Sequence, residues 1–211
     1  MSSPASAPHR RPRRAGRNRS EVVTAAVRVI ARRGVDHTRF ADVSAEAGVP
    51  ISTLQYYFGS REDMVLAAFD HAWRTEREEL DRESARTSDP WDRISRLVAA
   101  GIGGFTGSEE LRGLLWLEGV RLGVRDPETR TEVLGDYESW RSLLAGAIRD
   151  GLQSGAFISS LSPDDAAVVT LAMIDGAGLP LALQDPRLIE SSAVDLVLHA
   201  VAVLLGRDRV A

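Results

Sequence analysis

The sequence predicts an all-α protein of about nine helices, in which a small N-terminal unit of three helices precedes a larger helical unit. Two observations support this fold class. Apolar residues recur every three or four positions, and no stretch alternates apolar and polar residues for long enough to indicate a strand. In the C-terminal part, residue pairs that end helices stand between the apolar runs: Gly103-Gly104, Asp126-Pro127, Ser154-Gly155 and Asp185-Pro186.

Composition limits the classes of protein to which this chain can belong. Its 211 residues are enough to bury a core, and the lack of cysteine excludes disulfides and thiol chemistry. The basic start has no apolar stretch after its charges, so it does not resemble a secretory signal. No later run reaches the roughly 18 apolar residues of a membrane span. We therefore expect a soluble cytoplasmic protein.

Charge is distributed unevenly along the chain. Residues 1–61 hold 11 Arg against 4 acidic residues, whereas the remainder holds 15 Arg and 26 acidic residues. The N-terminal third is therefore suited to a polyanion. Residues 1–18, with Arg among Pro, Ser and Gly, are predicted to form a disordered basic arm. Such an arm either contacts the phosphates or the minor groove of DNA, or only increases solubility.

The first predicted helix begins at Ser20, a favourable N-cap residue, and ends at Gly34. Its Val, Ala and Ile residues form one apolar stripe. We interpret this helix as a brace for the two short helices that follow. Together the three helices make up the predicted N-terminal unit, residues 19–62.

Two short helices that cross at a steep angle are predicted between Arg39 and Phe58. Val43 faces inward from the first, Leu54 and Phe58 share a face of the second, and Gly48 permits the turn between them. This is the spacing of a helix-turn-helix motif. The second helix directs compact uncharged groups and an aromatic ring outward, a face that suits the major groove of DNA: Ile51, Ser52, Thr53, Gln55 and Tyr56.

At these positions the chain resembles the TetR/AcrR family of bacterial transcriptional regulators. The matching residues are Gly34, Thr38, Ala47, Gly48, Val49, Thr53, Leu54, Tyr57, Phe58, Ser60, Arg61 and Glu62. The chain differs from the family pattern at Arg39, Pro50 and Gln55. The resemblance implies a DNA-binding domain whose predicted contacts are Arg39, Ser52, Thr53, Gln55, Tyr56, Tyr57 and Arg61. We expect Thr53, Gln55 and Tyr56 to reach base edges or adjacent phosphates, and Ser52 and Arg61 to position the DNA backbone.

A long fourth helix is predicted to begin at Arg61 and to couple the N-terminal unit to the rest of the chain. Its first half is apolar on one side, and its second half is rich in charged residues. Further helices are predicted at about 90–104, 108–124, 127–154, 163–184 and 188–206. Residues 63–211 are thus assigned to a helical domain for ligand binding and dimerisation.

The C-terminal domain resembles that of the choline-responsive repressors of the family over residues 112–205. This resemblance implies a small-molecule cavity within the helices, and an aromatic box with a carboxylate would suit a quaternary ammonium ion. The predicted ligand contacts are Trp116, Glu118, Tyr137, Trp140 and Met173. The alternative is that Trp116 and Trp140 are ordinary core residues and that Glu118 pairs with Arg121 on the solvent face.

The last predicted helix indicates a homodimer. Its sequence, SSAVDLVLHAVAVLLG, is apolar on nearly all sides, although a terminal helix packs only one side against its own chain. With the apolar stretch AAVVTLAMIDGAG it would form a four-helix interface between two copies. Asp175 and Gly176 are interpreted as a break in that interfacial helix. A dimer also doubles the DNA contacts on a palindromic site.

No catalytic residue, cofactor or metal site is predicted. The four His residues are scattered, and no phosphate-binding loop or nucleophile elbow is present in the sequence. We predict a transcriptional repressor that binds a double-stranded palindromic operator as a homodimer and is released by an unidentified small molecule. The alternatives are an activator of the same architecture, or a small-molecule-binding module with weakened DNA binding.

Overall fold

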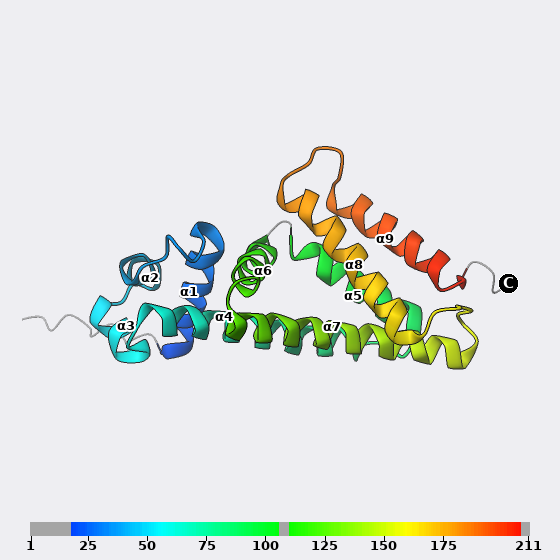
Figure 1. The fold of residues 1–211 in the computed structure, drawn as a ribbon, viewed down its shortest axis with the longest axis horizontal. Coiled ribbons are helices and arrows are strands. Elements are labelled where there is room, and N and C mark those ends of the chain that lie inside the picture. Colours follow the sequence, from blue (N-terminus) through cyan, green and yellow to red (C-terminus); the bar gives the residue numbers. More distant parts are fainter. Residues whose placement is uncertain (1–17, 106–109, 208–211) are drawn as a thin grey trace, which may run out of the picture.

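The computed structural model describes residues 18–105 and 110–207, which fold into nine helices without a strand (Figure 1). The helices are α1 (Arg19–Arg33), α2 (Phe40–Ala47), α3 (Ile51–Phe58), α4 (Arg61–Ser84), α5 (Pro90–Gly103), α6 (Glu110–Gly123), α7 (Pro127–Ser154), α8 (Pro163–Ala182) and α9 (Glu190–Leu204). The predicted all-α fold is confirmed. The predicted basic arm lies outside the described residues except for its last position.

The molecule is elongated, and α1, α2 and α3 form one end of it (Figure 1). Asn18 rather than the predicted Ser20 caps α1, because the Asn18 side chain accepts the Glu21 N–H at 2.9 Å. The predicted helix end is observed at Gly34, whose N–H donates to the Ile30 carbonyl at 2.8 Å. A first hydrophobic core fills this end and is built mainly from side chains of α1 to α4.

The long helix α4 belongs to two cores. Met64, Phe69 and Trp73 in its first half pack into the first core, together with Leu115 of α6. Leu80 near its end packs into a second core formed with α5, α7, α8 and α9. In Figure 1, α4 and α7 run along the long axis of the molecule between the two ends. A shift of α4 at the second core would therefore be transmitted to the helices at the other end.

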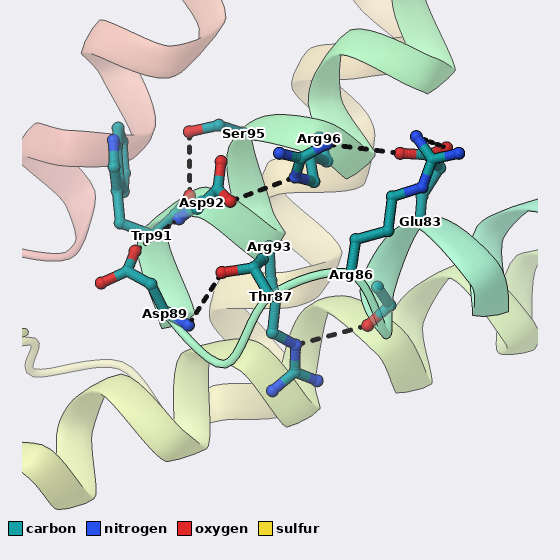
Figure 2. Close-up of polar contacts among 10 residues, drawn as sticks. Glu83, Arg86, Thr87, Asp89, Trp91, Asp92, Arg93, Ser95 and Arg96 are labelled. Carbon is teal, nitrogen blue, oxygen red and sulfur yellow. Dashed lines mark hydrogen bonds and ion pairs between the residues drawn. The ribbon is translucent and has the colours of Figure 1, made fainter.

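The turn from α4 into α5 is fixed by polar contacts (Figure 2). The Asp89 side chain caps α5 by accepting the Asp92 N–H at 2.7 Å, and the Asp89 N–H donates to the Thr87 hydroxyl at 3.2 Å. Glu83 pairs with Arg86 at 2.8 Å and with Arg96 at 3.6 Å. These short-range bonds hold the end of α4 against α5 on one side of the second core.

At the far end, α8 and α9 pack on the other helices with one face and expose apolar residues on another. Leu183, just after α8, is 81% exposed, and the other exposed large residues between the start of α8 and the end of α9 are Val168, Leu179, Ile189, Leu196 and Val203. By length and composition α8 is apolar enough to span a membrane, but 39% of its most apolar window is buried within the protein. It packs against α7 and α9.

Candidate functional site

The helix-turn-helix consists of α2, a turn through Gly48, and α3. Gly48 has φ of 65° and ψ of 33°, the left-handed conformation that disfavours residues with a side chain. The turn is also held by Ser44, whose hydroxyl donates to the Val49 carbonyl at 2.6 Å. Val43 and Leu54 are fully buried beneath the two helices. These contacts fix the orientation of α3 relative to α1 and α4.

The outer face of α3 is turned toward solvent. Tyr56 is 85% exposed, Ser52 and Gln55 are exposed, and Thr53 is half-buried beside them. Tyr57 is half-buried, and its ring lies 5.7 Å from that of Tyr56. Tyr56 lies between Thr53 and Gln55 around the helix axis, so the predicted base-contacting residues spread over the solvent-facing half of a short helix at the end of the molecule. A helix presented in this way fits the width of the major groove.

The two arginines predicted to contact DNA occupy different environments. Arg39 is exposed at the start of α2, where its backbone N–H donates to the Asp42 carboxylate at 2.9 Å. The half-buried guanidinium of Arg61 instead donates to the Thr38 carbonyl at 2.7 Å and to the Val35 carbonyl. Arg61 thus ties the start of α4 to the loop before α2. This role was not predicted, because an arginine at the start of a helix is usually solvated.

A cavity lies in the second core between α4, α5, α6, α7 and α8. Its walls include three of the five predicted ligand contacts, Trp116, Tyr137 and Trp140, together with Phe105. Trp116 packs edge-on against Phe105 at 5.7 Å and at a tilt against Tyr137 at 6.3 Å, measured between ring centroids. The free volume of about 40 Å³ is enough for about three water-sized groups.

Acidic side chains converge on this cavity. Glu76 of α4, Asp136 of α7 and Asp175 of α8 line it, together with a single basic residue, Arg112 of α6. Sequence reasoning missed Glu76 and Asp136, because both lie in highly charged stretches that are typical of a solvated helix face. Asp175 was predicted to mark a break in its helix, but that prediction was wrong, since α8 is continuous from Pro163 to Ala182.

Burial changes the proton affinity of these carboxyl groups. Loss of solvation, with the nearby Asp136 charge as a second cause, raises the pKa of Glu76 to about 8. Burial likewise raises the pKa of Asp136 to about 6, against the opposing effect of Arg77. Burial also raises the pKa of Asp175, against the opposing effect of the hydrogen bond that the Tyr137 hydroxyl donates to it at 2.7 Å. Near neutral pH the cavity therefore holds a proton on Glu76.

The other two predicted ligand contacts do not line the cavity. Met173 of α8 is half-buried against the second core. Glu118 of α6 points away from the cavity and accepts the Val35 N–H at 3.0 Å and the Arg121 guanidinium at 2.9 Å. The alternative pairing of Glu118 with Arg121 is therefore observed. The contact to Val35 joins α6 to the loop between α1 and α2, and the sequence did not indicate it.

Comparison with known proteins assigns both parts of the chain to one family. Residues 22–68 match the model described as bacterial regulatory proteins, tetR family. Residues 90–206 match the model described as BetI-type transcriptional repressor, C-terminal. The regulator BetI of Brucella anthropi is 33% identical over 81 residues, which cover 38% of this chain and 42% of that protein. The chain thus aligns with less than half the length of this relative.

Solved structures show the same fold over most of the chain. A putative transcriptional regulator from Saccharomonospora viridis, solved in complex with choline, is 26% identical with a TM-score of 0.76, covering 89% of this chain and 95% of that one. The regulator FadR of Bacillus subtilis, in complex with stearoyl-CoA, is 20% identical with a TM-score of 0.72, covering 86% of this chain and 96% of that one. Members of this family are DNA-binding regulators of transcription, not enzymes. The chain therefore belongs to the TetR family of bacterial regulatory proteins, with a C-terminal domain of the BetI type.

Proposed function

We propose that the protein is a cytoplasmic transcriptional repressor that binds a palindromic operator as a homodimer and leaves it when a small molecule occupies the cavity. The observation that supports this proposal best is the position of α6 between the two sites. Trp116 lines the cavity, and Glu118, two residues later, accepts the Val35 N–H of the helix-turn-helix domain. Residues two apart on a helix point to nearly opposite sides, so α6 contacts both sites at once.

The operator would be read by α3. In this proposal Thr53, Gln55 and Tyr56 contact base edges or adjacent phosphates, while Ser52 and Arg39 position the DNA backbone. Tyr57 supports the ring of Tyr56 and reaches the edge of the same face. Arg61 is left out of the proposed contacts, because its guanidinium is bonded to two backbone carbonyls within the domain.

The homodimer would form through α8 and α9. The exposed apolar side chains of Leu179, Leu183, Leu196 and Val203 are a surface that a monomer leaves in water. Two copies related by a two-fold axis would bury this surface and place their α3 helices on the same side of a duplex. Half-sites spaced by about one turn, on the order of 34 Å, fit this arrangement.

Ligand binding would weaken operator binding by enlarging the cavity. A molecule larger than about three water-sized groups enters only if the helices around it separate. Glu76 places α4 on the cavity wall, and the first half of α4 packs against the helix-turn-helix domain. A shift of α4 or α6 would change the distance between the two α3 helices. A coupling of roughly 1 to 3 kcal/mol is enough to weaken operator binding about 5- to 150-fold.

The proposal is tested by selecting bound sequences from random duplexes with the full-length protein and then measuring the affinity of the selected sequence. We expect a palindrome, two protein chains per duplex, and affinity at least 1000-fold above that for random DNA. A selection that yields no preferred sequence would favour the alternative of a small-molecule-binding module with weakened DNA binding. Transcription of a reporter with the selected site would separate a repressor from an activator.

A further inference from the structure

The cavity contains an acidic group that lacks a hydrogen-bond partner. Asp136 is only 2% exposed and lines the cavity, and its Oδ1 has no partner among the described residues. A buried polar atom without a partner destabilises the folded protein, and more so when it is charged. A ligand that donates a hydrogen bond to this oxygen would remove that destabilisation.

The other polar groups of the cavity do not supply the missing donor. Arg112 donates to the Glu79 carboxylate at 3.2 Å and to the Ala100 carbonyl at 2.9 Å. The Tyr137 hydroxyl donates to Asp175 at 2.7 Å. Among the described residues, three carboxyl groups line this space, the lining guanidinium of Arg112 is bonded elsewhere, and the Arg77 charge acts on Asp136 from outside the lining. The charge distribution favours a cation and disfavours an anion such as an acyl-CoA.

The walls of the cavity limit the size of that cation. Gly101 packs so closely that a Cβ there would lie 2.6 Å from Ile174 and 3.2 Å from Trp140. The free volume of about 40 Å³ takes the ammonium group itself, which is close to the size of a water molecule, and the carbon chain that carries it would be the part that separates the helices. A trimethylammonium group has no N–H to offer Asp136, and its three methyl groups require the walls to separate.

We infer that the cavity binds a small protonated amine that retains N–H donors, in preference to a quaternary ammonium ion. The ammonium group would donate to Asp136 and lie among the aromatic rings of Trp116, Tyr137 and Trp140, where cation–π attraction adds to the charge interaction. This inference rests on the proposed function only in using the same cavity as the effector site.

Proton release accompanies such binding. Glu76 is faced by Glu79 on its own helix, by Arg112 of α6, and by Asp136 and the Trp140 ring of α7, with Asp175 of α8 also on the cavity wall. A bound cation favours the ionised form of Glu76, which is largely protonated at pH 7 because its pKa is raised to about 8. Affinity for the amine therefore increases from pH 6 to pH 8, by up to about tenfold per pH unit for one proton released.

The test compares amines that share one carbon chain and differ in the number of methyl groups on nitrogen. Each is titrated into the full-length protein without DNA at pH 7.5, and its affinity is measured by calorimetry. The probes are 2-aminoethanol, its N-methyl and N,N-dimethyl derivatives, choline, and the neutral analogue 1,2-ethanediol. We expect affinity to fall with each methyl group, with choline at least tenfold weaker than 2-aminoethanol and no binding of the diol. Choline affinity within tenfold of that of 2-aminoethanol, binding of the diol, or no binding of any amine would overturn the inference.

Substitution of the unpaired acid gives a second test. Asp136→Asn keeps the shape of the side chain and removes its charge, and we expect at least tenfold weaker binding of 2-aminoethanol with the circular dichroism spectrum unchanged. Glu138→Gln is the matched control, because Glu138 is exposed on the same helix and pairs with Arg141. If Asp136→Asn fails to fold, the methylation series on the unaltered protein still decides the matter.

The two proposals fail in different ways. If an amine binds but operator affinity does not change, the amine site stands and the proposed release mechanism is wrong. If no amine binds but another small molecule releases the operator, the amine inference is wrong and the proposed function stands.

Discussion

The Glu118 carboxylate of α6 accepts the backbone N–H of Val35 at 3.0 Å and so joins the C-terminal domain to the loop between α1 and α2. Arg121, one turn away, reinforces the contact by pairing with Glu118 at 2.9 Å and with Asp36 at 3.1 Å. A charged acceptor for a backbone N–H is among the stronger hydrogen bonds in proteins. The loop that precedes the helix-turn-helix is therefore held by the same helix that borders the cavity.

Replacing Glu118 with Gln is expected to weaken this junction. The neutral acceptor makes a weaker bond to Val35 and loses its pairing with Arg121, at a cost of about 1 kcal/mol. For a chain of this length the melting temperature should fall by roughly 2 to 4 °C. Hydrogen exchange at the Val35 amide should become faster, whereas Glu78→Gln on the exposed side of α4 should change neither quantity.

Arg61→Ala is expected to destabilise the protein rather than to remove a phosphate contact. Two backbone carbonyls, of Thr38 and Val35, lose their guanidinium donor, which costs about 2 kcal/mol and lowers the melting temperature by roughly 4 to 8 °C. The salt dependence of operator binding should stay unchanged. A slope smaller by about one, with an unchanged melting temperature, would instead identify Arg61 as a phosphate contact.

Thr53→Ala and Gln55→Ala are each expected to weaken binding to the selected operator by about 1 to 3 kcal/mol. Binding to random duplexes should be nearly unaffected, because the lost contacts are proposed to be specific to bases. Ser142→Ala, an exposed position on α7, serves as the control. Operator affinity that is unchanged in both variants would show that another face of the domain contacts the DNA.

Leu196→Glu is expected to produce a monomer. Leu196 is 62% exposed on α9, and a carboxylate there would be buried without a partner in the proposed dimer. Sedimentation equilibrium should give the mass of one chain, and operator affinity should fall at least 100-fold. Leu134→Glu, which is 53% exposed on α7, should remain dimeric.

Stability is expected to decrease as the pH is raised through the neutral range. Glu76 has an ordinary pKa of 4.5 when unfolded and a pKa raised to about 8 by burial in the folded chain. The folded state therefore holds more protons between these values, so its free energy of unfolding falls as the pH rises from about 5 to 8.

The decrease due to Glu76 between pH 5 and pH 8 should be about 3 to 4 kcal/mol, or roughly 6 to 16 °C in melting temperature. Thermal melts in a buffer series measure it directly. Glu76→Gln should flatten this part of the curve and melt higher than the unaltered protein at pH 8. A profile that is the same in both proteins would show that Glu76 is ionised in the folded state.

Much of the fold follows from local sequence signals. Gly34, Gly48 and Gly155 end helices as predicted, and the pair Asp126-Pro127 begins α7 at the predicted residue. The cap of α1 was placed two residues late, because Ser20 and Asn18 are both good N-cap residues and only the structure distinguishes them. Helix ends depend on residues that are close in the sequence, so local sequence signals predict most of them.

The chemistry of the cavity was less predictable. Trp116, Tyr137 and Trp140 were predicted as ligand contacts, and they line the cavity. Large rings in apolar helices either pack in the core or line a pocket, so both possibilities could be stated from the sequence. Glu76 and Asp136 were missed, since the side of a charged helix that becomes buried is decided by packing against another helix. Helical periodicity alone contains no information about that partner.

The central claim is that a small molecule in the cavity and an operator on α3 oppose each other's binding. The most direct test measures the operator dissociation constant of the full-length protein at fixed salt, with and without a small molecule that raises the melting temperature, supplied at 100 times its own dissociation constant. We predict operator binding at least fivefold weaker with the ligand. An operator affinity that stays within twofold while the cavity is saturated would contradict the account.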